Sequence, residues 1–287
     1  MDGISFKEFS KNYNNKKNQI LYEEFISDLE TPISSLLKLS PNEKYSFLLE
    51  SVEGGDQRGR YSFLGINPDL IWEYKNKKIK ITGKNSKLIK TLKIDDKPLK
   101  SLRILIKNSQ TIKNLNLPPC PVLVGYMGYP MITLMENINL KNQDTINIPD
   151  SKFIRPKLIA AFDNIKDKIT LMTPVYYSEK ISAKKAYNDS KYEISKIIEK
   201  LRKEVLIKNI KRVKKNKKLI IKCNYTKKEY LKIIQKTKKF IKKGDIFQAV
   251  ISQRFKINYE LGAISLYRSL RRLNPSPFLV NLNFNNF

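Results

Sequence analysis

LLESVEGGDQRGRYSFLG, residues 48–65, begins as a buried strand, breaks into an acidic turn with two glycines, and resumes as a second apolar strand. A glycine-bearing turn between two such strands is typical of a hairpin. Glu50 and Ser51 stand where the first strand ends, and Arg60 follows a few residues on. Polar groups of both charge signs are therefore expected at one end of a sheet.

Strand patterns continue on both sides of this stretch. QILYEEFI at 19–26 predicts a strand, and YSFLGI, DLIWEYK and KIKITG predict a β-meander that ends at Gly83. Residues 157–175 predict a hairpin that turns at 164–168. Residues 121–136 begin as a buried strand whose two glycines permit close backbone approach.

Helical signals appear near the N-terminus and return in the second half. Thr31 can cap a short helix that has Pro32 at its first position. Thr226 and Glu229 form a capping-box pair, and Gly244 ends the helix that they begin. The same patterns predict a helix at 181–205, a strand at 246–257, a helix at 263–273 and a final strand at 275–287. The fold class is therefore α+β, with strands dominant early and helix–strand alternation late.

The charge of the chain is extreme, at +29 over 287 residues. Such a charge is compatible with nucleic-acid binding. The excess is almost entirely lysine, 46 against 10 arginines, and it is spread along the chain. The one dense run, at 208–218, lacks the interleaved aromatic residues of a nucleic-acid surface and is interpreted as a solvated linker.

The two cysteines and the hydropathy predict in which compartment the protein resides. Cys120 and Cys223 are far apart and in no metal-binding spacing, so both are expected to be reduced thiols. No apolar run reaches the length of a membrane-spanning helix, and the first residues do not resemble a signal peptide. The expectation is a cytoplasmic protein with neither membrane nor nucleic acid as a partner.

Four stretches follow one another along the chain in this order: LLESVEGGDQRGRYSFLG, GYMGYP, GDIFQAVISQRF and YRSLRRLNPSPF. With them the chain resembles anthranilate synthase component I, the chorismate-using subunit of tryptophan biosynthesis, from about residue 20 onward. The sister family, aminodeoxychorismate synthase component I, shares the layout. It does not usually carry the ESVEGG turn, and it tends to have a Cys-Tyr pair where this chain has Ile246 and Phe247.

The resemblance implies both a fold and a reaction. The fold would be two packed, mostly antiparallel β-sheets with outer helices. The reaction would convert chorismate and ammonia to anthranilate and pyruvate with Mg²⁺, the ammonia coming from a glutaminase subunit, anthranilate synthase component II. Tryptophan would bind a separate site and inhibit.

The resemblance places that tryptophan site at LLES and NPSPF, and the chemistry of these residues suits an amino acid. Glu50, the Ser51 hydroxyl and the carbonyls beside prolines can accept from an ammonium, and Arg60 can meet a carboxylate. Taken alone, the two motifs are more often a plain turn and a helix stop. The residues expected at the site are Leu49, Glu50, Ser51, Arg60, Asn274, Pro275, Pro277, Phe278 and Leu279.

The resemblance also implies that the chorismate pocket, the catalytic histidine and the acidic Mg²⁺ ligands follow the NPSP turn. The chain contains no histidine and ends at Phe287. No catalytic or metal-binding residue is therefore assigned, and the chain is expected to be an N-terminal portion that is inactive alone. Three alternatives stay open: aminodeoxychorismate synthase component I, a non-catalytic tryptophan-binding remnant, and a basic nucleic-acid-binding protein.

The expected organisation has three parts. Residues 18–176 form an N-terminal region, residues 177–222 a helix and basic linker, and residues 223–287 the beginning of a chorismate-binding region.

Overall fold

The structure is a computed structural model that describes residues 3–53, 57–83, 89–90, 97–140, 144–205, 220–274 and 276–285. The basic run at 208–218 and the glycine pair Gly54 and Gly55 lie outside these residues. The elements, in chain order, are α1 (Phe6–Asn14), β1 (Gln19–Ile26), α2 (Pro32–Leu39), β2 (Tyr45–Glu50), β3 (Val52–Glu53), β4 (Gln57–Arg58), β5 (Tyr61–Lys75), β6 (Lys78–Gly83), α4 (Pro98–Asn108), β7 (Val124–Met127), the 3₁₀ helix η1 (Tyr129–Leu134), β8 (Ser151–Asp163), β9 (Lys168–Val175), α5 (Ala183–Leu201), β10 (Lys222–Cys223), α6 (Lys227–Lys243), β11 (Phe255–Lys256), α7 (Ala263–Leu273) and β12 (Leu279–Phe284).

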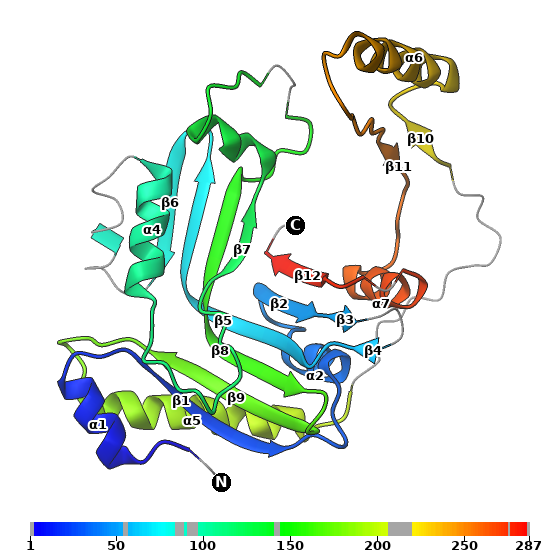
Figure 1. The fold of residues 1–287 in the computed structure, drawn as a ribbon. Helices are drawn as coiled ribbons and strands as arrows, with labels where there is room; N and C mark the ends of the chain where they lie inside the picture. The colour runs from blue at the N-terminus through cyan, green and yellow to red at the C-terminus, as the bar shows by residue number, and fades with distance from the viewer. Residues whose placement is uncertain are drawn as a thin grey trace. The chain divides into compact units, whose positions relative to one another are not determined.

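One antiparallel sheet of eight strands dominates the described chain (Figure 1). Its main path is β1-β9-β8-β5-β2-β12, with β6 added to β5 and β7 added to β8. The central strands β5 and β8 are long, and each pairs with different strands along its two halves. One half of β5 pairs with β2, the other half pairs with β6, and the register of β5 against β8 shifts between Pro68 and Leu70.

This continuity corrects two predictions. YSFLGI and DLIWEYK are not separate strands of a meander, because both belong to β5. The described strands also do not form two packed sheets; they form the large sheet and two two-stranded ladders. The α+β class is confirmed, and the bend in β5 and β8 lets a single sheet present two differently covered parts.

The part of the sheet around β6 and β7 is covered by α4, which the sequence did not predict (Figure 1). Trp72 of β5 is fully buried there, and its Nε1 donates a 3.0 Å hydrogen bond to the Ser101 hydroxyl of α4. Leu102 and Leu105 face the same cluster. A tryptophan N–H needs a partner when it is buried, and α4 supplies it.

The part around β1 and β9 is covered by α1 and α5 (Figure 1). The ring of Tyr187 of α5 lies 5.2 Å from that of Phe9 of α1, which is fully buried. Local capping agrees with the sequence here: Thr31 caps α2 with Pro32 in its first turn. The predicted strand at 19–26 and the hairpin that turns at 164–168 are confirmed as β1 and as β8–β9.

Gly125 shows why GYMGYP needs its first glycine. It lies in β7 against β8, and a Cβ built on it would stand 2.0 Å from the carbonyl oxygen of Lys152. The expected close approach of backbone is therefore confirmed at this position.

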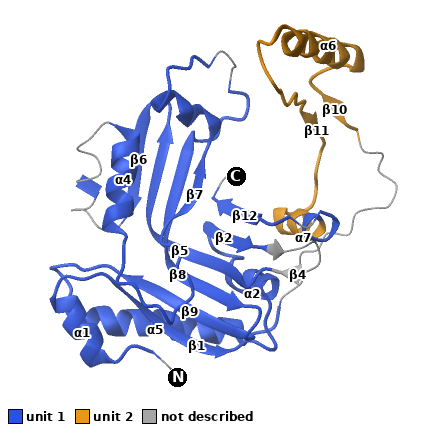
Figure 2. Ribbon diagram, in the orientation of Figure 1, with its two compact units in different colours: residues 1–206, 270–287 blue, residues 207–269 orange. Residues whose placement is uncertain are grey.

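Residues 1–206 and 270–287 form one compact unit, and residues 207–269 form a second (Figure 2). The sequence-based division at 176 and 222 stays a separate prediction, because these units follow spatial contacts. In the second unit the capping box of Thr226 and Glu229 begins α6, and Gly244 ends it with a φ of 79°. The predicted strand at 246–257 is wrong except at Phe255–Lys256, which pairs with β10.

Candidate functional site

The two motifs that the sequence assigned to one site lie on neighbouring strands. β12 pairs antiparallel with β2, so that Leu279 stands opposite Glu50 and Val280 opposite Leu49 (Figure 1). Both strands belong to the first compact unit. Chain segments more than 200 residues apart are thereby joined by backbone hydrogen bonds at the place where LLES ends and NPSPFL begins.

Glu50 is the most buried polar group at this junction, with 3% of its side chain exposed. Arg271 of α7 donates from Nη2 to Glu50 Oε1 at 2.9 Å. A buried carboxylate requires such compensation, because an unpaired buried charge is costly. Sequence reasoning did not select Arg271, although an arginine one turn before Asn274 in YRSLRRLNPSPF was the signal available.

Ser51 and Gly59 are in direct backbone contact at the end of β2. The Gly59 N–H donates to the Ser51 carbonyl at 2.7 Å, and a Cβ on Gly59 would lie 2.6 Å from the Ser51 Cβ. Glycine is therefore required at 59 for this approach. The Ser51 side chain is half-buried at the end of β2.

Arg60, the residue expected to receive a ligand carboxylate, already has a partner. Its Nε and Nη2 lie 3.2 and 3.0 Å from Asp163 Oδ2, and its guanidinium lies 4.8 Å above the Tyr61 ring. Burial alone would raise the pKa of the Asp163 carboxyl, but hydrogen bonds from Arg60 and from two backbone amides outweigh it and lower that pKa. The same hydrogen bond raises the pKa of Arg60.

The strand register places Leu49 and Leu279, two apolar residues expected to line the same site, on opposite faces of the sheet. Directly opposed residues of antiparallel strands point to the same face, and successive residues alternate. Glu50 and Leu279 therefore share one face, while Leu49 and Val280 share the other. Leu49 packs against the cluster around Phe47, so Leu49 and Leu279 do not line one continuous slot along these strands.

The NPSPF side of the junction is accessible. Asn274 ends α7, and its N–H donates to the Leu270 carbonyl at 2.9 Å. Phe278 is 83% exposed, and Pro277 is exposed as well. Pro275 lies outside the described residues. The Phe278 side chain is therefore open to solvent.

A divalent cation has no evident place among the described residues, which gather no group of three or more carboxylate, thiol or imidazole side chains. No described helix is long and apolar enough to cross a membrane.

The chain therefore has an α+β architecture in which β12, near the C-terminus, pairs with β2 of the N-terminal half. A family model described as chorismate binding enzyme matches residues 47–287, and the chain belongs to this family. Within it, the chain is a homologue of anthranilate synthase component I.

Individual relatives show how much of such a protein is present. The chain is 36% identical to anthranilate synthase component 1 of Cereibacter sphaeroides, over 99% of this chain and 57% of the relative. It is 32% identical to the same component of Acetivibrio thermocellus, over 92% and 53%. A crystal structure of anthranilate synthase component I from Streptococcus pneumoniae matches the fold with a TM-score of 0.57 at 23% identity, covering 88% of this chain and 53% of that one. The chain thus spans about half the length of these relatives.

Proposed function

We propose that this chain is part of an anthranilate synthase component I and contributes the tryptophan inhibitor site of that enzyme. The complete enzyme would convert chorismate and ammonia to anthranilate and pyruvate in the cytoplasm, with Mg²⁺. A glutaminase subunit, component II, would supply the ammonia. Homology to named anthranilate synthases over nearly the whole chain supports this proposal.

The observation that carries the inhibitor site is the register of β2 and β12. An amino-acid ligand needs an acceptor for its ammonium, a donor for its carboxylate and an apolar surface for its side chain. Glu50 and Arg271 meet at this strand end, and the exposed Phe278 precedes Leu279, the residue that stands opposite Glu50. No single motif contains all three.

The Glu50–Arg271 pair suggests how a zwitterion is received. Among the described residues Arg271 donates to Glu50 through Nη2, and 22% of its side chain is exposed. An incoming ammonium replaces the guanidinium at Glu50, and the guanidinium turns to the ligand carboxylate. Charge balance is kept throughout, so the buried carboxylate is never left without a cation. This role falls to Arg271, because Arg60 is held by Asp163.

Calorimetric titration of tryptophan into the purified chain tests the proposal. Calorimetry is preferred because Trp72 would confuse a fluorescence signal. We expect saturable binding that Glu50→Gln weakens about 10- to 100-fold, as for a charge-assisted hydrogen bond, and that Ser51→Ala weakens about fivefold. Ser195→Ala, an exposed serine on α5, is the matched control and should bind as the parent does.

A folded chain that binds tryptophan equally well with Glu50→Gln would contradict the assignment of the site. A folded chain that binds no tryptophan would contradict the proposal that these residues are sufficient for it. The enzymatic part is tested by mixing the chain with a separately expressed C-terminal half of the Cereibacter sphaeroides relative, chorismate and ammonium. Fluorescent anthranilate should form in the mixture, and neither half alone should produce it.

A further inference from the structure

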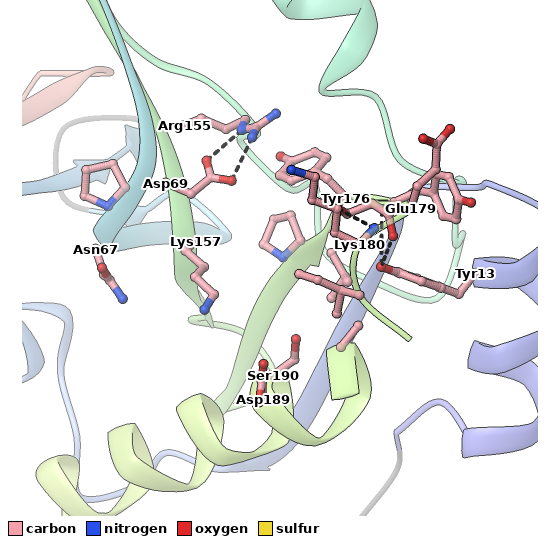
Figure 3. A pocket seen from close by; sticks show the side chains of 17 residues that line it. Tyr13, Asn67, Asp69, Arg155, Lys157, Tyr176, Glu179, Lys180, Asp189 and Ser190 are labelled. Carbon is pink, nitrogen blue, oxygen red and sulfur yellow. Dashed lines mark hydrogen bonds and ion pairs between the residues drawn. The ribbon is translucent and has the colours of Figure 1, made fainter. Parts of the chain in front are cut away.

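The same compact unit contains a cavity at the bulge of β5, where the register against β8 shifts. The cavity, of about 420 Å³, opens between the β5 bulge, the end of β9 and the first turns of α5 (Figure 3). This volume is within the range of small-molecule sites. The cavity is distinct from the Glu50 junction, because Pro68 pairs with Pro156 here, whereas Tyr61 pairs with Asp163 at the strand end nearer the junction.

The cations of β8 differ in how they are compensated. Lys152 pairs with Glu73 at 3.0 Å. Arg155 is 1% exposed and donates from Nε and Nη2 to the two carboxylate oxygens of Asp69, each at 2.7 Å (Figure 3). Lys157, two residues further on the same face, also lines the cavity and is half-buried. Among the described residues it has neither an ion pair nor a side-chain hydrogen bond.

The acidic groups of the cavity are already engaged or solvated. Both oxygens of Asp69 are used by Arg155. The Asp189 carboxylate lies 3.9 Å from the Lys185 ammonium of the same helix, and 55% of its side chain is exposed. At the rim, Glu179 and Lys180 carry opposite charges, and both side chains are exposed. Among the described lining residues the half-buried cation that remains is Lys157, so a ligand that complements the cavity brings a negative charge.

The walls between these charges are largely apolar. They include Pro68, Pro174 and Ile181, together with the Tyr176 ring, over which the Arg155 guanidinium lies at 3.8 Å. The Tyr176 hydroxyl is buried and has no hydrogen-bond partner among the described residues. Burial raises the pKa of this phenol even though the Arg155 cation opposes the shift. An electrostatic contact beside this buried hydroxyl is weakly screened.

We propose that this cavity binds a small aromatic carboxylate, whose carboxylate group contacts the Lys157 ammonium and whose ring packs on the proline and tyrosine walls. Figure 3 shows Lys157 directed toward the side of the cavity that α5 forms with Ser190 and Asp189. Asn67 and Ser190 stand on either side of Lys157 and offer further donors. The site takes an anion, because the Lys157 ammonium, the Asn67 amide and the Ser190 hydroxyl can each donate to one, while its carboxylates are paired or solvated.

Three ligands with one carbon skeleton test the charge requirement in calorimetric or NMR titrations of the whole chain: 3-phenylpropanoate, its neutral amide, and phenylalanine. We expect 3-phenylpropanoate to bind at least tenfold more tightly than the amide, since the amide cannot form the charged contact. Phenylalanine should also bind more weakly than 3-phenylpropanoate, because its ammonium stands near Lys157. Equal binding of acid and amide, or no saturation of a folded chain by about 10 mM acid, overturns the proposal.

Variants of the cavity make opposite predictions. Lys157→Met keeps the aliphatic stem and should weaken 3-phenylpropanoate about tenfold. Asp189→Asn removes a like charge and should leave binding unchanged or tighten it. Lys184→Met, an exposed lysine on α5 outside the cavity, is the matched control. If Lys157→Met binds as the parent does, or if Asp189→Asn weakens binding tenfold, the ligand is not held as an anion at Lys157.

Discussion

The two compact units use helices in opposite ways. In the first unit α5 buries Ile194, Ile197 and Leu201 against its neighbours. In the second unit α6 is longer than most of the described helices and well capped, yet none of its residues, all of them described, is buried. Phe240 and Ile241, on its apolar stripe, are 41% and 42% exposed.

This difference separates helix formation from helix burial. The cap at Thr226 and the αL residue at Gly244 satisfy the backbone at both ends of α6 from within the helix. An amphipathic pattern states only that one face needs a cover, and most helical stability in proteins comes from that cover. The helices of the first unit have such covers within the described chain, whereas α6 has no buried residue.

The largest expected contrast is between two aromatic truncations. Trp72→Ala removes a fully buried ring and leaves Ser101 without this hydrogen bond, so it should cost about 3–5 kcal/mol of unfolding free energy. Phe240→Ala should cost less than about 1 kcal/mol, because 41% of this residue is already exposed and no residue of α6 is buried. Urea unfolding followed by far-UV circular dichroism measures both. Equal costs would show that α6 is packed in solution.

Thiol alkylation gives the next contrast, because each unit holds one cysteine. Burial raises the pKa of the Cys120 thiol to about 12. Since the thiolate is the reacting form, Cys120 should react about a thousandfold more slowly than an ordinary free thiol at neutral pH. Cys223 is exposed and should be labelled first. Peptide mapping after timed iodoacetamide treatment tells the two apart, and prompt labelling of Cys120 would indicate that the first unit opens.

A glycine substitution in the first unit should have an intermediate effect on stability. An alanine at Gly125 would place its Cβ 2.0 Å from the Lys152 carbonyl oxygen, so β7 has to move from β8. We expect a cost of about 1–3 kcal/mol, as for overpacking. Gly262→Ala in the second unit meets no described atom within 4 Å and serves as the control. Thermal melts compare the two, and an unchanged midpoint for Gly125→Ala would contradict the close approach of the strands.

The smallest effect is a pH dependence. The folded pKa of Asp163 is lowered, so its contribution to stability is fully present above its ordinary value near 3.8 and is lost as the pH falls through the lower folded value. The Arg60 side chain is 45% exposed, so solvent screening keeps this contribution small. Asp163→Asn should therefore flatten the acid limb of the stability profile below about pH 4. Hydrogen bonds from Thr226 lower the pKa of Glu229 in the second unit, and Glu229→Gln should leave the melting of the first unit unchanged.

Sequence patterns identify the elements whose signals are local. The caps at Thr31 and Thr226 and the hairpin after Asp163 are confirmed, because each rests on residues within a few positions of one another. Prediction fails where a short apolar pattern depends on distant neighbours. The segment 246–257 alternates like a strand but is mostly irregular in the described structure. The helix α4 was missed because polar residues surround its one apolar face.

At the candidate site the division is similar. Glu50, Ser51 and the NPSPF segment are identifiable from motif chemistry alone, and the tryptophan that they are expected to bind stays a prediction. The partner of Glu50 was missed, since Arg271 is 221 residues away and only strand pairing brings it near. Arg60 was expected to meet a ligand, but Asp163, from the far end of β8, occupies it.

The sequence by itself determined the caps, the turns, most of the strand and helix types and the family, because these depend on neighbouring residues and on ordered motifs. Only the tertiary structure decided three further features: the single bent sheet, the face that each strand residue occupies, and the position of Lys157 in its cavity. Each of these depends on which distant segments pair. The free energy of such pairing comes from burial and charge compensation across the whole unit, and no local pattern records it.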